Sequence, residues 1–81
     1  MLSELKDSPA FIGLKQSRRA LDEGRVAKAF VARDADERVV RTFIADCSAM
    51  NVEVEQVESM VKLGHAAGIE IGAAVAVVLK N

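Results

Sequence analysis

Stretches of small and β-branched apolar residues alternate along this chain with helical apolar stripes, and this alternation limits the fold most. Val26–Ala32 and Ile71–Leu79 are almost continuously apolar, as in strands that are buried on both faces. Strands that alternate with helices pack as a sheet with helices on both faces. We therefore expect an α/β fold, a three-layer α/β/α sandwich with a small mixed central sheet. The segment between these strands has its apolar residues at helical spacing, namely Val39, Val40, Phe43, Ile44, Cys47 and Met50.

Glycine, proline and small polar residues divide the rest of the chain into further elements. Gly24, Asn51 and Gly68 stand where helices commonly end in a left-handed residue. Either Asp34 or Asp36 is suited to cap the helix that follows. The expected elements are a short helix over Ser3–Ser8 ended by Pro9, a brief strand at Phe11–Ile12, a helix over Leu14–Glu23, a strand over Val26–Ala32, a helix ending at Asn51, a strand over Val52–Glu55, a helix from Ser59 through Ala66, and a strand over Ile71–Leu79.

Length and composition predict one aliphatic domain over residues 1–81, because the chain suits one modest core and not two. The aromatic residues are three Phe, with no Trp or Tyr, which disfavours binding of single strands by base stacking. One Cys permits no internal disulfide and favours a reducing compartment. The sequence has no signal-peptide pattern and no apolar run of membrane-spanning length. We expect a soluble cytoplasmic protein with no membrane partner.

Charge is distributed unevenly, although the formal net charge is only −1. From Gly13 to Lys28 five cations face two carboxylates, a net +3, whereas from Arg33 to Glu58 three cations face seven carboxylates, a net −4. Such asymmetry allows one face to attract an anion while another repels it, and scatter in a short chain produces it too.

The positive segment contains one stretch with several ligand-binding groups close together, Gly13 to Arg19. On a helix, Lys15, Gln16 and Arg19 share one face. Gly13 has no side chain to cap the first turn, so its N–H groups, with their partial positive charge, stay available to an anion. Taken alone, an ordinary solvated helix face explains these residues better than a binding site does.

Catalytic and metal-binding patterns are missing from the sequence. Cys47 belongs to an apolar helical stripe, where a small inert core residue is expected. His65 is the only histidine and has no second metal-type ligand at a useful spacing, and helix capping explains the acidic residues Asp34, Asp36 and Glu37. We expect no catalytic residues, metal or cofactor.

The glycine-rich stretch Gly64–Gly72 does not match the dinucleotide-binding pattern, and it leads from a helix into a strand, the wrong order for phosphate capture. Its Ile69 and Ile71 flank Glu70. These two apolar side chains either pack into the core or form a contact surface, and the residues alone leave both open.

Three stretches, Ile12–Leu21, Phe30–Asp36 and Leu63–Ala74, together resemble the kink-turn-binding ribosomal proteins, and most closely their short bacterial, L7Ae-like members. The resemblance covers nearly the whole chain in the same order. It implies an α/β/α sandwich that binds RNA at a kink-turn, an asymmetric bulge followed by sheared G·A pairs. The implied partner is structured RNA with a kink-turn, in ribosomal RNA or an mRNA leader. We expect no DNA binding and a monomer.

The same resemblance implies which residues contact RNA. Lys15 and Gln16, after Gly13, stand where other branches carry the Asn and Glu that read the G·A guanines, and Arg19 matches a basic residue that meets phosphate or base. Ile69, Glu70 and Ile71 are implied to cover the unstacked bulge nucleotide, and Asp36 aligns with an acidic residue near it. The chain departs from common relatives at His65, where a Lys or Arg is usual, and at Ala67, where Cys is frequent.

Two other functions remain as alternatives. One is a protein-interaction module of the translation machinery that uses the Ile69–Ile71 loop. The other is a small-molecule enzyme, which is the least favoured because no catalytic constellation is present.

Overall fold

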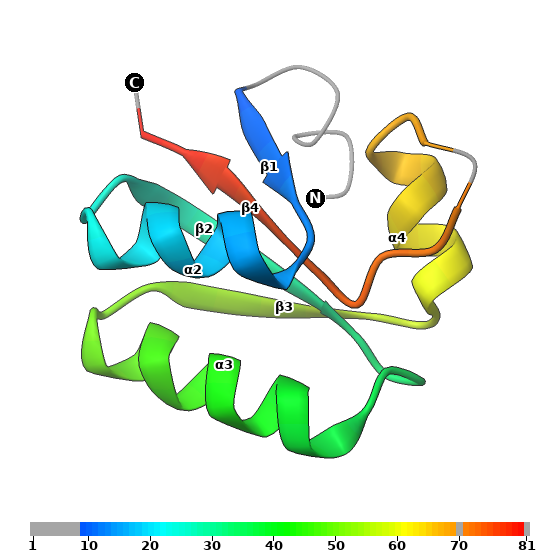
Figure 1. Cartoon of the computed structure of the whole chain (residues 1–81), viewed down its shortest axis with the longest axis horizontal. Helices are drawn as coiled ribbons and strands as arrows, with labels where there is room; N and C mark the ends of the chain where they lie inside the picture. Colours follow the sequence, from blue (N-terminus) through cyan, green and yellow to red (C-terminus); the bar gives the residue numbers. More distant parts are fainter. Residues whose placement is uncertain (1–8, 70, 81) are drawn as a thin grey trace.

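The computed structural model describes residues 9–69 and 71–80, so the helix expected over Ser3–Ser8 lies outside the described residues. The path of the chain is drawn in Figure 1. In chain order its elements are β1 (Ala10–Ile12), α2 (Leu14–Asp22), β2 (Val26–Ala32), α3 (Glu37–Ala49), β3 (Glu53–Val57), α4 (Met60–Ala66) and β4 (Val75–Leu79).

The strands form one mixed sheet in the order β1-β4-β2-β3. Strand β4 lies inside the sheet, antiparallel to both neighbours, and its Val77 pairs with Phe11 of β1 and Ala29 of β2. Strands β2 and β3 are parallel, with Phe30 opposite Glu55, and α3 makes the crossover between them. Strand β4, one of the two inner strands, is therefore the last described strand in the chain and pairs with the first, β1.

Helices cover both faces of this sheet, which confirms the three-layer sandwich (Figure 1). On one face Leu21 of α2 and Phe43 of α3 are buried in the same core cluster as Val31 and Val77. On the other face Leu63 of α4 belongs to a second cluster with further residues of β2 and β4. Alternate residues of β2 and β4 enter opposite clusters, as the two-residue period of a strand requires.

The capping residues show how the turns are fixed. Asp36 caps α3, because its Oδ1 accepts a hydrogen bond of 2.9 Å from the backbone N–H of Arg38. Asp34 instead reaches a different helix, and its Oδ1 accepts a hydrogen bond of 2.8 Å from the backbone N–H of Met60, at the start of α4. The turn after β2 is thus tied to the helix after β3.

Several expected boundaries differ from the structure. Strand β4 begins at Val75 and not at Ile71, because residues 71–74 carry the chain from α4 to the sheet, where the N–H of Ala73 donates to the carbonyl of Met60. Helix α2 ends at Asp22, one residue early, and β3 is shifted toward Val57. Met50 lies past the last turn of α3 and is 45 % exposed, so it does not continue the buried stripe.

The left-handed positions were predicted correctly, since Gly24, Asn51 and Gly68 all have positive φ. In the described part of the chain no helix combines the length and apolar character needed to cross a membrane.

Candidate functional site

Helix α2 begins without a capping side chain. Gly13 occupies the N-cap position with φ of +97°, a conformation that favours glycine, and no side chain of the described residues bonds to the cap. The first turn contains no acidic residue either. The N–H of Gly13 donates to the carbonyl of Val75 at 3.0 Å, so this helix start is anchored to the beginning of β4. The N–H groups of the first turn therefore face outward with partial positive charge.

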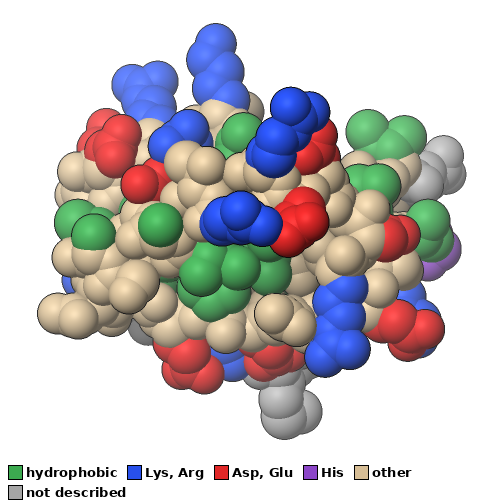
Figure 2. Space-filling view, turned by 90° about the horizontal axis from the view of Figure 1, so that it is seen from below, with side chains coloured by type: hydrophobic (Ala, Val, Ile, Leu, Met, Phe, Trp, Pro, Cys, Tyr) green, Lys and Arg blue, Asp and Glu red, His purple; other side chains and the backbone are tan. Residues whose placement is uncertain are grey.

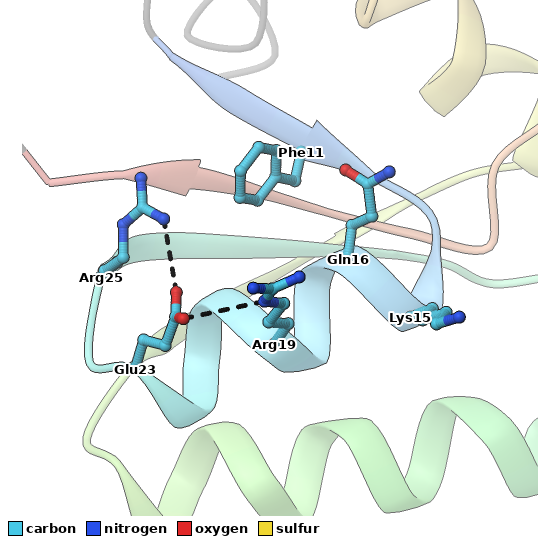
Figure 3. A pocket seen from close by; sticks show the side chains of 6 residues that line it. All are labelled: Phe11, Lys15, Gln16, Arg19, Glu23 and Arg25. Carbon is cyan, nitrogen blue, oxygen red and sulfur yellow. Dashed lines mark hydrogen bonds and ion pairs between the residues drawn. The ribbon is translucent and has the colours of Figure 1, made fainter.

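A groove of about 520 Å³ runs along α2 beside β1, and Figure 3 shows the side chains around it. Lys15 and Gln16 are exposed, and in the part of the chain that the structure describes no hydrogen bond or ion pair occupies either side chain. Arg19 is 82 % exposed, and its Nε lies 3.7 Å from Oε2 of Glu23. The residues that line the groove are Phe11, Lys15, Gln16, Arg19, Glu23 and Arg25.

The structure divides the positive segment between two faces. Lys28 lies on the α4 side of the sheet, 5.4 Å from the ring centroid of Phe30, and its Nζ is 2.9 Å from Oε1 of Glu55. Arg18 is held by Asp46 of α3, with 2.6 Å between Nη2 and Oδ2. The net charge of +3 counted from Gly13 to Lys28 therefore overstates the positive potential at the groove, because Lys28 and Arg18 form ion pairs away from it.

The outer face of α3 has a different character. Positive and negative side chains lie close together there around a small hydrophobic patch (Figure 2). Arg41 and Glu37, one helical turn apart, form an ion pair beside Val40 and Ile44. Because the charges on this face pair locally, it offers less to an anion than the start of α2 does.

The loop between α4 and β4 separates its two isoleucines. Ile69 packs against the cluster on the α4 side of the sheet, whereas Ile71 is 75 % exposed; Glu70 lies outside the described residues. A Cβ on Gly64 would stand 2.1 Å from the carbonyl oxygen of Ile71, so only glycine lets this loop lie directly on α4. The expectation of a contact surface thus fits Ile71, and the expectation of core packing fits Ile69.

Backbone hydrogen bonds bring these segments together at one end of the sheet (Figure 1). Just before β4, the carbonyl of Ala74 accepts from the N–H of Ala32 at 2.8 Å, and the next carbonyl accepts from Gly13. The start of β4 thus lies between the start of α2 and the turn after β2. That turn leads to Asp36, which lines a smaller groove between α2 and α3 together with Leu14.

Of the eight predicted site residues, Ile69 packs against the core and Glu70 lies outside the described residues, and the other six fall into three groups. Gly13, Lys15 and Gln16 form the helix start, with Arg19 one turn further along the groove. Ile71 lies on the loop before β4 at the same end of the sheet. Asp36 is nearby, but its carboxylate is engaged in capping α3 and lies 3.6 Å from the guanidinium of Arg38.

Sequence reasoning missed the far end of the groove, formed by Phe11, Glu23 and Arg25. The signal that was available is their placement around the two glycines that bound α2, since Glu23 and Arg25 flank Gly24 and Phe11 lies two residues before Gly13. Sequence reasoning also missed Gly64, because an approach between a helix and a distant loop leaves no periodic pattern.

The remaining reactive side chains do not assemble into a site. Cys47 is buried, and this burial, with a smaller contribution from Asp46, raises the pKa of its thiol from 9.0 to about 11. His65 is exposed on α4. Among the described residues no three acidic, histidine or cysteine side chains are placed to hold a metal ion.

Solved structures share this α/β/α fold. The structure of a 15.5kD RNA binding protein from Giardia lamblia matches with a TM-score of 0.88 and 21% identity, over 99% of this chain and 71% of that one. A protein of unknown function from Bacillus halodurans matches with a TM-score of 0.85 and 23% identity, over 98% of this chain and 83% of that one. The molecule is therefore a small domain of a fold found in an RNA-binding protein.

Sequence relatives define the family. An RNA-binding protein of Geobacillus thermodenitrificans is 44% identical over 69 residues, which cover 85% of this chain and 84% of the relative. The RNA-binding protein YbxF of Geobacillus stearothermophilus has the same identity and coverage. The model of the ribosomal protein L7Ae/L30e/S12e/Gadd45 family matches residues 4–81. The chain belongs to this family.

Proposed function

We propose that this protein is a non-catalytic RNA-binding protein that recognises and stabilises kink-turn RNA, a bulge followed by sheared G·A pairs. The observation that carries the proposal is the start of α2, where Lys15 and Gln16 have no partner among the described residues and no side chain caps the helix. Membership of the family and the names of the relatives as RNA-binding proteins support it.

The chemistry of this helix start suits a kinked RNA. A regular RNA duplex hides its major groove, so proteins read bulges and distorted sites instead. Guanine presents its O6 and N7 acceptors there, and the ammonium of Lys15 and the amide of Gln16 are donors of the right kind. A kink also crowds phosphates together, and the positive end of α2 with Arg19 offsets that repulsion.

The loop before β4 supplies the apolar part of the proposed site. Ile71 is exposed on the loop that leads into β4, and the first residue of β4, Val75, accepts a hydrogen bond from the N–H of Gly13. An unstacked nucleotide at the bulge needs an apolar surface to cover its base. Asp36 contributes indirectly in this scheme, since its carboxylate fixes the start of α3. The natural ligand in this proposal is a kink-turn of ribosomal RNA or of an mRNA leader in the cytoplasm.

Titration of the protein with a kink-turn oligonucleotide tests the proposal. The control RNA has the same length, with the G·A pairs replaced by Watson–Crick pairs. We expect much tighter binding to the kink-turn, and equally weak binding to both RNAs would overturn the specific claim. Lys15→Ala and Gln16→Ala should each remove about 1–3 kcal/mol of this discrimination.

Two further variants separate charge from base recognition. Arg19→Ala should weaken binding to both RNAs by similar factors, because a phosphate contact carries no sequence information. Arg41→Ala is the matched control, an exposed cation on the outer face of α3, and should change neither affinity.

The exposure of Ile71, at 75 %, and of Val61, at 57 %, favours a second candidate function, a protein-interaction module. A stoichiometric protein partner that remains bound after ribonuclease treatment, and that Ile71→Ser releases, would support this candidate over RNA binding.

A further inference from the structure

The groove beside α2 holds a carboxylate between two guanidinium groups. Oε1 of Glu23 lies 3.3 Å from Nη1 of Arg25, and Oε2 of the same carboxylate lies 3.7 Å from Nε of Arg19. The dashed lines in Figure 3 show both contacts along one wall of the groove. Two guanidinium groups that converge on one small anion have the arrangement that also binds a phosphate.

Arg25 is held in place by more than this ion pair. Its guanidinium lies over the ring of Phe11, 5.7 Å from the centroid, at the end of the groove opposite Lys15. This contact fixes the side chain at the groove wall, so that less rotamer entropy is lost when the guanidinium binds a ligand.

Helix stability does not account for a carboxylate at this position. Glu23 follows the last residue of α2, at the negative end of the helix dipole, where an acidic side chain is unfavourable. Its two ion pairs, 3.3 and 3.7 Å long, join exposed side chains, so each contributes little to the free energy of folding. Its larger effect is on the potential of the groove, because it offsets charge on the two arginines.

We propose that the groove from Arg19 to Arg25 is a second contact track for the RNA phosphate backbone, and that Glu23 acts in it as an intramolecular competitor for phosphate. This inference rests on the proposed RNA binding and extends it beyond the helix start and the loop. Glu23 sets affinity and its salt dependence, while Lys15 and Gln16 set the choice of RNA.

The test compares Glu23→Gln with the wild type. Glutamine keeps the shape of the side chain and removes its charge, so both guanidinium groups become available to phosphate. We expect binding of the kink-turn oligonucleotide to tighten on the order of tenfold. The plot of log binding constant against log salt concentration should also become steeper, by the amount that roughly one to two additional phosphate contacts produce. Unchanged affinity, or weaker binding by a variant with the wild-type Tm, would overturn the inference.

Glu37→Gln is the matched control. It removes one carboxylate from an ion pair between residues one turn apart, as Glu23→Gln does, but on α3 and outside the groove. An equal gain in both variants would show a general effect of net charge and would contradict a role for the groove.

A double-mutant cycle with Arg25→Gln tests the pairing itself. In the wild type Arg25→Gln should weaken binding modestly, because Glu23 offsets only part of the charge of this cation. In the Glu23→Gln background the same change should remove most of the gain. Additive effects would refute the competition.

Elution from heparin separates failure of this inference from failure of the proposed function. In one outcome the wild type shows no preference for the kink-turn, and Glu23→Gln still elutes from heparin at higher salt than Glu37→Gln. This result would support the phosphate contact track and overturn kink-turn recognition. In the other outcome the wild type prefers the kink-turn, while Glu23→Gln and Glu37→Gln behave alike on RNA and heparin. This result would overturn the phosphate contact track and support the proposed function.

Discussion

Gly64→Ala tests how the loop before β4 is held. Alanine is the better helix former, so propensity alone predicts that this change stabilises α4 by about 1 kcal/mol. The structure predicts the opposite, because the new Cβ would stand 2.1 Å from the carbonyl oxygen of Ile71 and 3.1 Å from its carbonyl carbon. These are backbone atoms, which cannot turn away as the end of a side chain can.

The magnitude follows from what must move. Forcing a methyl group into a closely packed site costs about 1–3 kcal/mol. Lifting the loop also strains two hydrogen bonds, from Ile69 to the carbonyl of Gly64 and from Ala73 to that of Met60, both 3.0 Å long, at about 0.5–1.5 kcal/mol each. After the gain in propensity, these contributions give a net loss of about 1–5 kcal/mol, with a midpoint of about 3 kcal/mol.

Thermal unfolding followed by circular dichroism measures this loss. For a domain of this size the midpoint of the loss corresponds to a fall in Tm of roughly 12–24 °C. Gly68→Ala is the control in the same segment, because its φ of +82° is unfavourable for alanine while a Cβ there meets no atom within 4 Å. It should cost about 1–2 kcal/mol. A Gly64→Ala variant with a Tm equal to or above that of the wild type would refute the reasoning.

Three other predictions concern stability and reactivity. Ser17→Ala should stabilise the protein by about 1–2 kcal/mol in urea unfolding, because the Ser17 hydroxyl is buried without a hydrogen-bond partner among the described residues; a loss of stability would contradict this. Cys47 should resist a thiol reagent at pH 8 until denaturant is added, since its pKa of about 11 and its burial keep the thiol protonated and covered; rapid native labelling would contradict this. The hydrogen bond from Lys28 lowers the pKa of the Glu55 carboxyl below 4.5, so this group contributes stability above pH 4.5 that is lost as the pH falls through its lower folded value. The free energy of unfolding of Glu55→Gln should therefore fall less steeply at acid pH than that of the wild type. The same pH dependence in both proteins would contradict this role of Glu55.

Local patterns predicted the elements well where one stretch of chain determines them. Val26–Ala32 is a strand with the predicted limits, because its apolar run and the flanking Gly24 and Arg33 define both ends. Ser59 caps α4 as predicted, with its Oγ 3.1 Å from the N–H of Lys62. In each of these cases the decisive contacts lie within a few residues of the chain.

The errors arise where distant segments meet. Ile71 is β-branched and begins an apolar run, as a strand residue would, but the approach of its backbone to α4 holds it outside the sheet. Asp34 and Asp36 were equal candidates to cap the next helix; Asp36 does so, and the bond from Asp34 to a helix in a later part of the chain had no local signal. Composition also overstated the charge at the groove, since Arg18 and Lys28 reach partners that only the tertiary structure identifies. The roles of the groove residues in RNA binding stay predictions for the titrations above.

The position of β4 between β1 and β2 has a consequence for folding. Neither of these strands contacts the other across the sheet, so the sheet remains in two parts until β4 enters between them. The same event places the carbonyl of Val75 against Gly13 and thereby sets the start of α2 beside the loop before β4. Because this closure joins segments far apart in sequence, it is expected to be a slow step. A nascent chain that has not yet paired β4 therefore lacks the alignment of α2 with the loop before β4, and this end of the sheet is assembled only when β4 pairs.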